Sequence, residues 1–318
     1  MINITKIFND IQSVTITLFK IMIPTIIVVK LFEELGLIII CTEIMKPLTG
    51  FIGLPSELAI VLTTTMLINL YAGLIVISAI TFTQDLTLAQ STILAMFMLF
   101  THGLPVEVLI SSKSGVRAWV TIFIRVGSGI IFCFLLNHIM NSFSYFSKKI
   151  SINLPKTLPN DDITYWIIGQ FKSLFFILII IILLIIFLEI LKSLGIEKLI
   201  RLIFKPFLKF LGIGEKASTI AVVGVTLGVS FGGGLLIKEV SSGKIPRNDV
   251  FGVVCLINLF HSAFEDTSLM MLLNPSLIII LFGRAFFSIL VVFFLMIIVK
   301  KLPDIFWEKY LINKNLSC

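Results

Sequence analysis

A short polar stretch interrupts one of the long apolar segments of this chain. Residues 258–267 read Asn-Leu-Phe-His-Ser-Ala-Phe-Glu-Asp-Thr and place His261, Glu265 and Asp266 among hydrophobic neighbours. Ionisable side chains are expensive at membrane depth, so they are rare there without a partner or a function. Histidine changes its charge near neutral pH, and carboxylates bind protons and cations. The stretch, which Asn258 opens, therefore indicates a proton-responsive or cation-binding site.

The same pattern occurs once before in the chain. Three pairs share an offset of 159 residues: His102 with His261, Glu107 with Asp266, and Arg125 with Arg284. The chain has only three His residues, and two of them fall in this register. The spacing indicates an internal duplication whose clearest markers are ionisable residues.

Composition places the chain in the membrane. Hydrophobic residues make up 58% of the 318 positions and charged residues 14%, too few charges to cover the surface of a soluble domain. Several apolar runs are about 20 residues long, which predicts an all-α polytopic membrane protein. The net charge of +7 is scattered between the runs, so nucleic acid is not an expected partner. The four Cys residues have no paired spacing, which argues against a disulfide framework or a Cys-ligated metal.

The duplication divides the chain into parts. Residues 1–142 form a first copy, 143–163 a polar linker, 164–301 a second copy and 302–318 a tail. Lys46-Pro47 and Lys205-Pro206 keep the 159-residue offset, in stretches expected to lie along the membrane interface.

Small and polar residues interrupt one segment of each copy. Segment 56–82 contains Asn69, and segment 215–240 contains Gly232, Gly233 and Gly234. Close packing of helices would explain such residues. A broken or re-entrant helix that offers backbone groups to a substrate would explain them as well.

The basic residues favour the re-entrant alternative. If every segment crosses the membrane, Lys and Arg outside the spans divide 11 against 9 between the two sides, which is no bias. If the two interrupted segments enter and leave on one side, the division becomes 16 against 4, with both termini on the basic, cytoplasmic side of the cell membrane. Each copy then crosses three times, so the copies are inverted, as in many transporters.

These residues together resemble a known family. Two copies with an interfacial Lys-Pro, a Gly-rich segment and the sequence His261-Ser262-Ala263-Phe264-Glu265-Asp266-Thr267 look like the Gate-domain, or nucleoside recognition, membrane proteins. That group includes spore maturation membrane proteins and the permease regions of ferrous-iron transporters, and it is similar in plan to concentrative nucleoside transporters. The resemblance covers about 15–140 and 165–300. The first copy departs from the pattern, because residues 102–107 keep the His and one carboxylate but lack the Ser and Thr.

The resemblance and the inverted plan imply a secondary transporter that moves a nucleoside-like solute or a cation through a site between the inverted copies. The titratable His residues beside carboxylates are compatible with proton coupling. A membrane scaffold similar to the spore maturation proteins is the alternative. An enzyme is not expected, since neither His-Glu-x-x-His nor a Ser/His/Asp set is evident. No cofactor is predicted; the expected partners are the lipid bilayer and a small solute or ion, and a homo-oligomer is compatible with the sequence.

Helical spacing makes finer predictions about the site. His261 and Glu265 are four residues apart and would share one face of a continuous helix, where with Asp266 they are the candidate metal ligands. Asp266 would then pair with Arg284 on the following span. A mutually neutralising network that sets helix register is the structural alternative to a binding site.

Overall fold

A computed structural model describes residues 34–80, 85–152, 163–228 and 245–313, together with Leu154, single positions between 8 and 31, and positions 237 and 240. Helices dominate this part of the chain, and its β-structure consists of two isolated bridges. The prediction of an all-α protein is confirmed. Gly232, Gly233 and Gly234 lie outside the described residues.

Three helical stretches of the described residues are long and apolar enough to cross a membrane: Leu88–Lys113, Ala118–Asn141 and Ile279–Val299. A fourth candidate is bent. Its two parts, Glu43–Phe51 and Ser56–Leu67, meet at 118°, which is the geometry of a broken span or a re-entrant segment. Phe282 and Phe286 in the last span are 65% and 69% exposed, as expected for side chains that meet lipid.

The chain forms two compact units, each built from segments that are discontinuous in sequence. Unit 1 contains Met1–Gly103, Cys133–Leu194 and Ser268–Ser276, and unit 2 contains Leu104–Phe132, Gly195–Thr267 and Leu277–Cys318. Each unit therefore combines residues of both sequence copies.

Unit 1 contains a tight hairpin of two short helices, α3 (Ala59–Leu67) and α4 (Leu70–Ala79). Asn69 begins α4, and its side-chain oxygen accepts a hydrogen bond from the backbone N–H of Ala72 at 2.9 Å. The two arms touch closely, since a Cβ on Gly73 would lie 2.0 Å from Thr65 Oγ1. The interrupted segment of the first copy is thus broken at Ile68–Asn69. The other helical elements that contribute to this unit are α2 (Leu37–Phe51), η1 (Ser56–Leu58), α5 (Leu88–Thr101), α8 (Ser128–Asn141), η3 (Ser144–Ser147), α9 (Ile163–Ser193) and η4 (Met271–Leu273).

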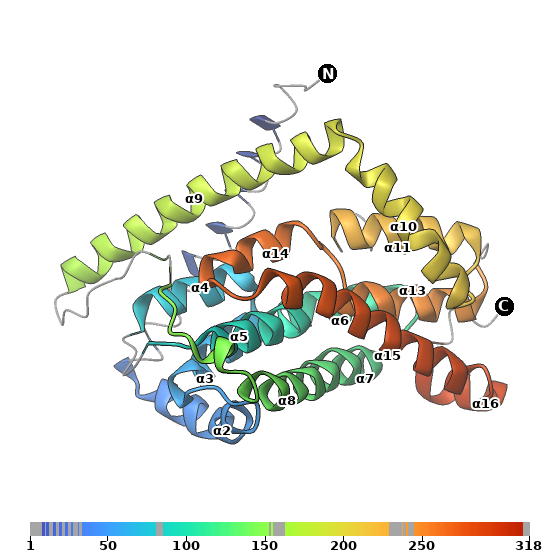
Figure 1. Ribbon diagram of the computed structural model, residues 1–318, viewed down its shortest axis with the longest axis horizontal. Helices are drawn as coiled ribbons and strands as arrows, with labels where there is room; N and C mark the ends of the chain where they lie inside the picture. The colour runs from blue at the N-terminus through green and yellow to red at the C-terminus, as the bar shows by residue number, and fades with distance from the viewer. Residues whose placement is uncertain are drawn as a thin grey trace. The chain divides into compact units, whose positions relative to one another are not determined.

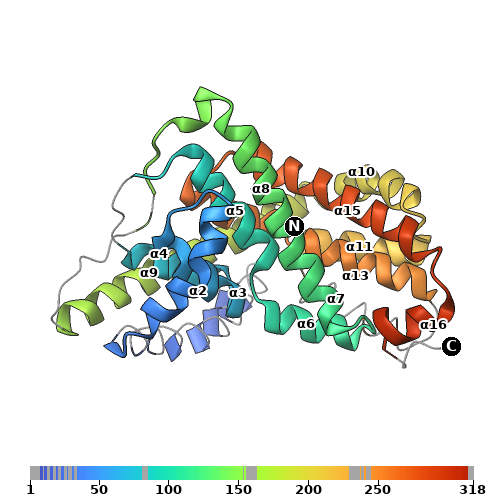
Figure 2. The ribbon, with the colours of Figure 1, turned by 90° about the horizontal axis from the view of Figure 1, so that it is seen from below.

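Four helices of unit 2 pack in the order α10 (Ile196–Phe210), α11 (Glu215–Leu227), α13 (Arg247–Leu259) and α15 (Arg284–Val299) (Figure 1). Figure 2 shows the same four helices from below. Residues 312 and 313 hydrogen-bond to the turn between α6 (Leu104–Lys113) and α7 (Ala118–Ile122). Arg117 Nε donates to Ile312 O at 3.0 Å, and Asn313 N donates to Gly115 O at 2.8 Å. Further described elements of the unit are the π-helical turns η2 (Phe123–Gly127) and η5 (Ile279–Gly283), the start of α14 (Glu265–Met270), α16 (Asp304–Phe306) and η6 (Trp307–Leu311).

The helix boundaries repeat the 159-residue offset. Helices α2 and α10 are both 15 residues long, start 159 positions apart and carry Pro47 and Pro206 at the same place. Helices α5 and α13 also start 159 positions apart. The duplication that is visible in the sequence is therefore repeated in the local structure.

Candidate functional site

The polar stretch of the second copy lies at a break between two helices. Helix α13 ends at Leu259, and α14 (Glu265–Met270) starts only after the non-helical residues 260–264. The prediction of one continuous helix with His261 and Glu265 on a shared face is therefore wrong. Ser262 has a φ of 45°, in the left-handed region that few side chains adopt. This conformation turns the chain at the point where helical hydrogen bonding stops.

Neighbouring helix α11 supplies acceptors for the exposed backbone of the break. Ser262 N donates to Gly224 O at 3.4 Å, and Ala263 N donates to Val225 O at 2.8 Å. Phe260 and Ala263 also pack against Val225 in a buried apolar cluster. Backbone N–H groups within a membrane must be satisfied by the protein itself, and these contacts make an interrupted helix tolerable here.

Unit 1 contains the equivalent break after α5. Gly103 has a φ of 61°, and its N–H donates to Thr65 O at 3.0 Å. Each of these residues lies 159 positions before its counterpart in the second copy, Ser262 and Gly224. His102 Nδ1 contacts Met98 O at 3.0 Å, just as His261 Nδ1 contacts Ile257 O at 2.8 Å. The first copy uses Gly where the second uses Ser, so the departure in sequence preserves the same turn.

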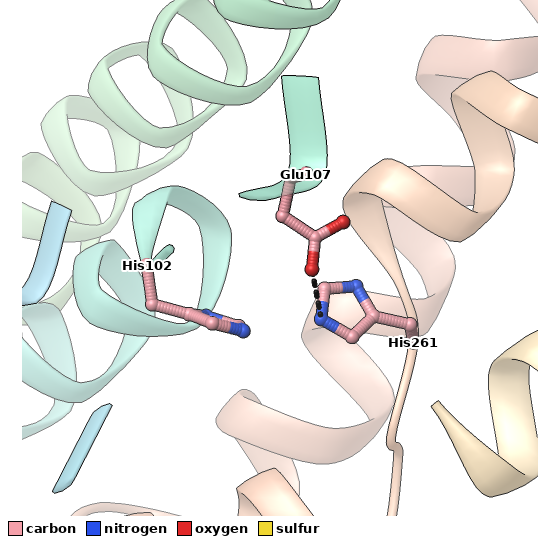
Figure 3. Close-up of side chains that lie close together, drawn as sticks. All are labelled: His102, Glu107 and His261. Atoms are coloured by element: carbon pink, nitrogen blue, oxygen red, sulfur yellow. Dashed lines mark ion pairs between the residues drawn. The ribbon is translucent and has the colours of Figure 1, made fainter. Parts of the chain in front are cut away.

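His261 faces two carboxylates. Its Nε2 lies 3.5 Å from Glu107 Oε1 and 3.7 Å from Asp266 Oδ2, and Figure 3 shows the Glu107 contact. Because a carbonyl oxygen only accepts hydrogen bonds, the contact with Ile257 O assigns a proton to Nδ1. In the neutral imidazole, Nε2 therefore presents a lone pair to both carboxylates. This nitrogen is ready to take a proton or to bind a cation.

Glu107 faces Arg125 of the first sequence copy as well as His261 of the second. Arg125, fully buried on the π-helical turn η2, places its Nη1 at 3.7 Å from Glu107 Oε2 and donates from the same nitrogen to Asn258 O at 2.8 Å. The Asn258 side-chain amide donates to Ser111 Oγ at 2.9 Å and to Val254 O at 2.8 Å. Helices α6 and α13 are thereby joined through Asn258 and Ser111.

Arg284 contacts the two residues at which the helix break begins, Leu259 and Phe260. It starts α15 immediately after the π-helical turn η5, is fully buried, and donates from Nε to Leu259 O, the last carbonyl of α13, at 3.0 Å. Its guanidinium carbon lies 5.4 Å from the centre of the Phe260 ring, a cation–π contact. Asp266 and Arg284 are both buried in unit 2, and their pairing stays a prediction.

Glu107, Arg125, His261, Asp266 and Arg284 form what we call the buried charge cluster. All five belong to unit 2, although Glu107 and Arg125 come from the first sequence copy. Each is at most 8% exposed. Two carboxylates balance two guanidinium groups when His261 is neutral, so protonation of His261 adds one net positive charge. Such a cluster can respond to pH or to a bound cation.

Three other residues that the sequence predicts for the site are not members of the buried charge cluster. Glu265 is half-buried at the start of α14, while Asn69 and His102 belong to unit 1. Ser111 is not among the residues that the sequence predicts for the site, although it lies four residues after Glu107 in an apolar segment, a spacing that puts both on one helix face.

A metal ion would find a different ligand set from the predicted one. The carboxylates that meet His261 Nε2 are those of Glu107 and Asp266, at 3.5 and 3.7 Å. Ligand atoms that share an ion through bonds of about 2.1 Å are separated by about 3.0–3.5 Å. Within this unit, Glu107 and His261 are the described residues whose ligand atoms lie close enough to share one ion.

The fold and the buried charge cluster define an α-helical membrane protein. Over 260 residues the chain is 26% identical to the uncharacterized membrane protein YvoD of Bacillus subtilis (strain 168), across 80% of this chain and 81% of that protein. No family model matches the chain, and no solved structure matches it. The resemblance to Gate-domain proteins therefore stays a prediction.

Proposed function

We propose that this membrane protein is a secondary transporter that binds a small polar solute or a cation at the buried charge cluster and couples its movement to protons. The observation that carries the proposal is the position of His261 Nε2 between Glu107 and Asp266, in a buried site. Burying five ionisable groups in a membrane protein is costly, and such groups commonly mark ion pathways and proton relays.

The tautomer of His261 suggests how coupling works. With Nδ1 committed to Ile257 O, a proton and a cationic group of a substrate compete for the same position at Nε2. Either one adds the positive charge that the two carboxylates favour. Protonation therefore releases the substrate, and deprotonation readmits it, which is the exchange that a proton-coupled carrier requires.

The broken helices and the duplication support the same proposal. Interrupted helices with polar residues at the break are a recurring feature of transporters built from inverted repeats. Both breaks of this chain keep the same backbone hydrogen bond, from Gly103 to Thr65 and from Ser262 to Gly224. We propose that the copies are inverted, with both termini in the cytoplasm, as the 16-to-4 division of basic residues favours.

The test is solute-dependent proton flux. The purified protein is reconstituted into liposomes that contain a pH-sensitive dye, and a panel of nucleosides and divalent cations is added outside under a pH gradient. The wild type should give saturable proton flux with at least one solute, and His261→Ala and Glu107→Gln should abolish it. Phe286→Ala, on an exposed apolar surface, is the matched control and should retain the flux.

Two results would contradict the proposal. One is flux at the wild-type rate, with the wild-type pH profile, in a folded His261→Ala variant. The other is absence of flux for the whole panel together with stoichiometric co-purification of another protein, which would favour a scaffold instead.

A further inference from the structure

Unit 2 contains a groove between helix α10 and the first turns of α11, and none of the residues that line it belongs to the buried charge cluster. The groove has a volume of about 530 Å³. Its floor is apolar and buried, formed by Leu208, Ile213 and Val222. Lys205 and Lys209 line one wall, and Glu215, Ser218 and Thr219 line the other. We refer to it as the lysine groove.

We propose that the lysine groove binds the headgroup of an anionic phospholipid. The lysine ammonium groups would contact the lipid phosphate, and the apolar floor would accept the glycerol backbone and the start of an acyl chain. This site is independent of the proposed transport function.

The position of α10 favours a lipid over a soluble ligand. An apolar stripe on this helix is exposed, with Leu202 at 70%, Ile203 at 50% and Phe210 at 65%. In a membrane protein, a helix with an exposed apolar stripe and a basic face lies in the plane of the interface, with its basic residues at headgroup level. The groove therefore opens where headgroups are concentrated.

The charges of the groove favour an anion. Lys205 Nζ lies 3.3 Å from Glu215 Oε1, and both side chains are exposed, so water screens this pair and a phosphate can compete with Glu215. Among the described residues, Lys209 forms no ion pair with a carboxylate. Asp249, the other nearby acid, is engaged with the backbone N–H of Gly214 at 2.9 Å. Lys209 is thus available to an incoming phosphate.

Native mass spectrometry of the intact protein tests the proposal, with phosphatidylglycerol and phosphatidylcholine of identical acyl chains as probes. Each lysine at the membrane surface contributes about fivefold to affinity for anionic lipid. Wild type should prefer phosphatidylglycerol, and the Lys205→Gln/Lys209→Gln double variant should lose about five- to thirtyfold of that preference. Glu215→Gln, which removes the competing carboxylate, should increase it.

The matched control is Lys148→Gln/Lys149→Gln, two exposed lysines outside the groove. The proposal is overturned if this control loses as much preference as the groove variant, or if wild type does not distinguish the two lipids. It is also overturned if inorganic phosphate or glycerol 3-phosphate displaces the bound lipid at equal concentration, because the groove would then be a site for soluble phosphate esters. If the double variant does not fold, the Glu215→Gln result decides the question alone.

Discussion

Replacing Arg125 with Gln should show how much the buried charge cluster contributes to the free energy of unfolding. Arg125 is fully buried, and its Nη1 both faces Glu107 Oε2 at 3.7 Å and donates to Asn258 O at 2.8 Å. The Glu107 side chain is only 10% exposed, so water does little to screen the charge left behind. Removing one partner of a buried ion pair destabilises a protein by about 3–5 kcal/mol. We expect a loss in this range for Arg125→Gln.

A double-mutant cycle separates the ion pair from general damage to packing. Unfolding in detergent would be followed for Arg125→Gln, Glu107→Gln and the double variant. The double variant should be less destabilised than the sum of the single variants, because neither partner is then left charged and buried. Lys205→Gln, which breaks an exposed pair, is the control and should change stability by less than about 1 kcal/mol. Additive losses would refute the inference that Arg125 and Glu107 stabilise each other.

Three further predictions concern backbone strain, packing and topology. Gly228→Ala should destabilise by at least about 2 kcal/mol, because Gly228 has a φ of 83° and a Cβ there would lie 2.3 Å from Ser262 Oγ; Gly50→Ala, with open space at its Cβ, should be neutral or stabilising in the same unfolding assay. Trp307→Ala should cost about 3–5 kcal/mol in thermal or denaturant unfolding, because the indole is 2% exposed and its N–H donates to Val299 O. A Cys at position 85 in a Cys-free background should react with an impermeant thiol reagent only from outside the cell; labelling from the cytoplasm alone would contradict the re-entrant topology.

The sequence by itself determined the class of protein and the chemistry of its polar residues. Apolar runs long enough to span a bilayer exclude a soluble fold, because the free energy of burying them in lipid is set by composition and length. The 159-residue offset paired His102 with His261, and the structure repeats that offset in helix boundaries and in backbone hydrogen bonds. Local features of this kind depend on neighbouring residues, so they can be inferred without tertiary contacts.

Tertiary structure decided which of these residues meet. Helical spacing predicts a shared face for His261 and Glu265 only while the helix is continuous, and the break at residues 260–264 removes that condition. The break depends on acceptors that α11 supplies from a distant part of the sequence. Likewise, Glu107 reaches His261 because α6 belongs to unit 2, together with residues of the second copy. Which distant segments pack together depends on the fit of whole helical surfaces, and a spacing rule along one helix carries no information about that fit.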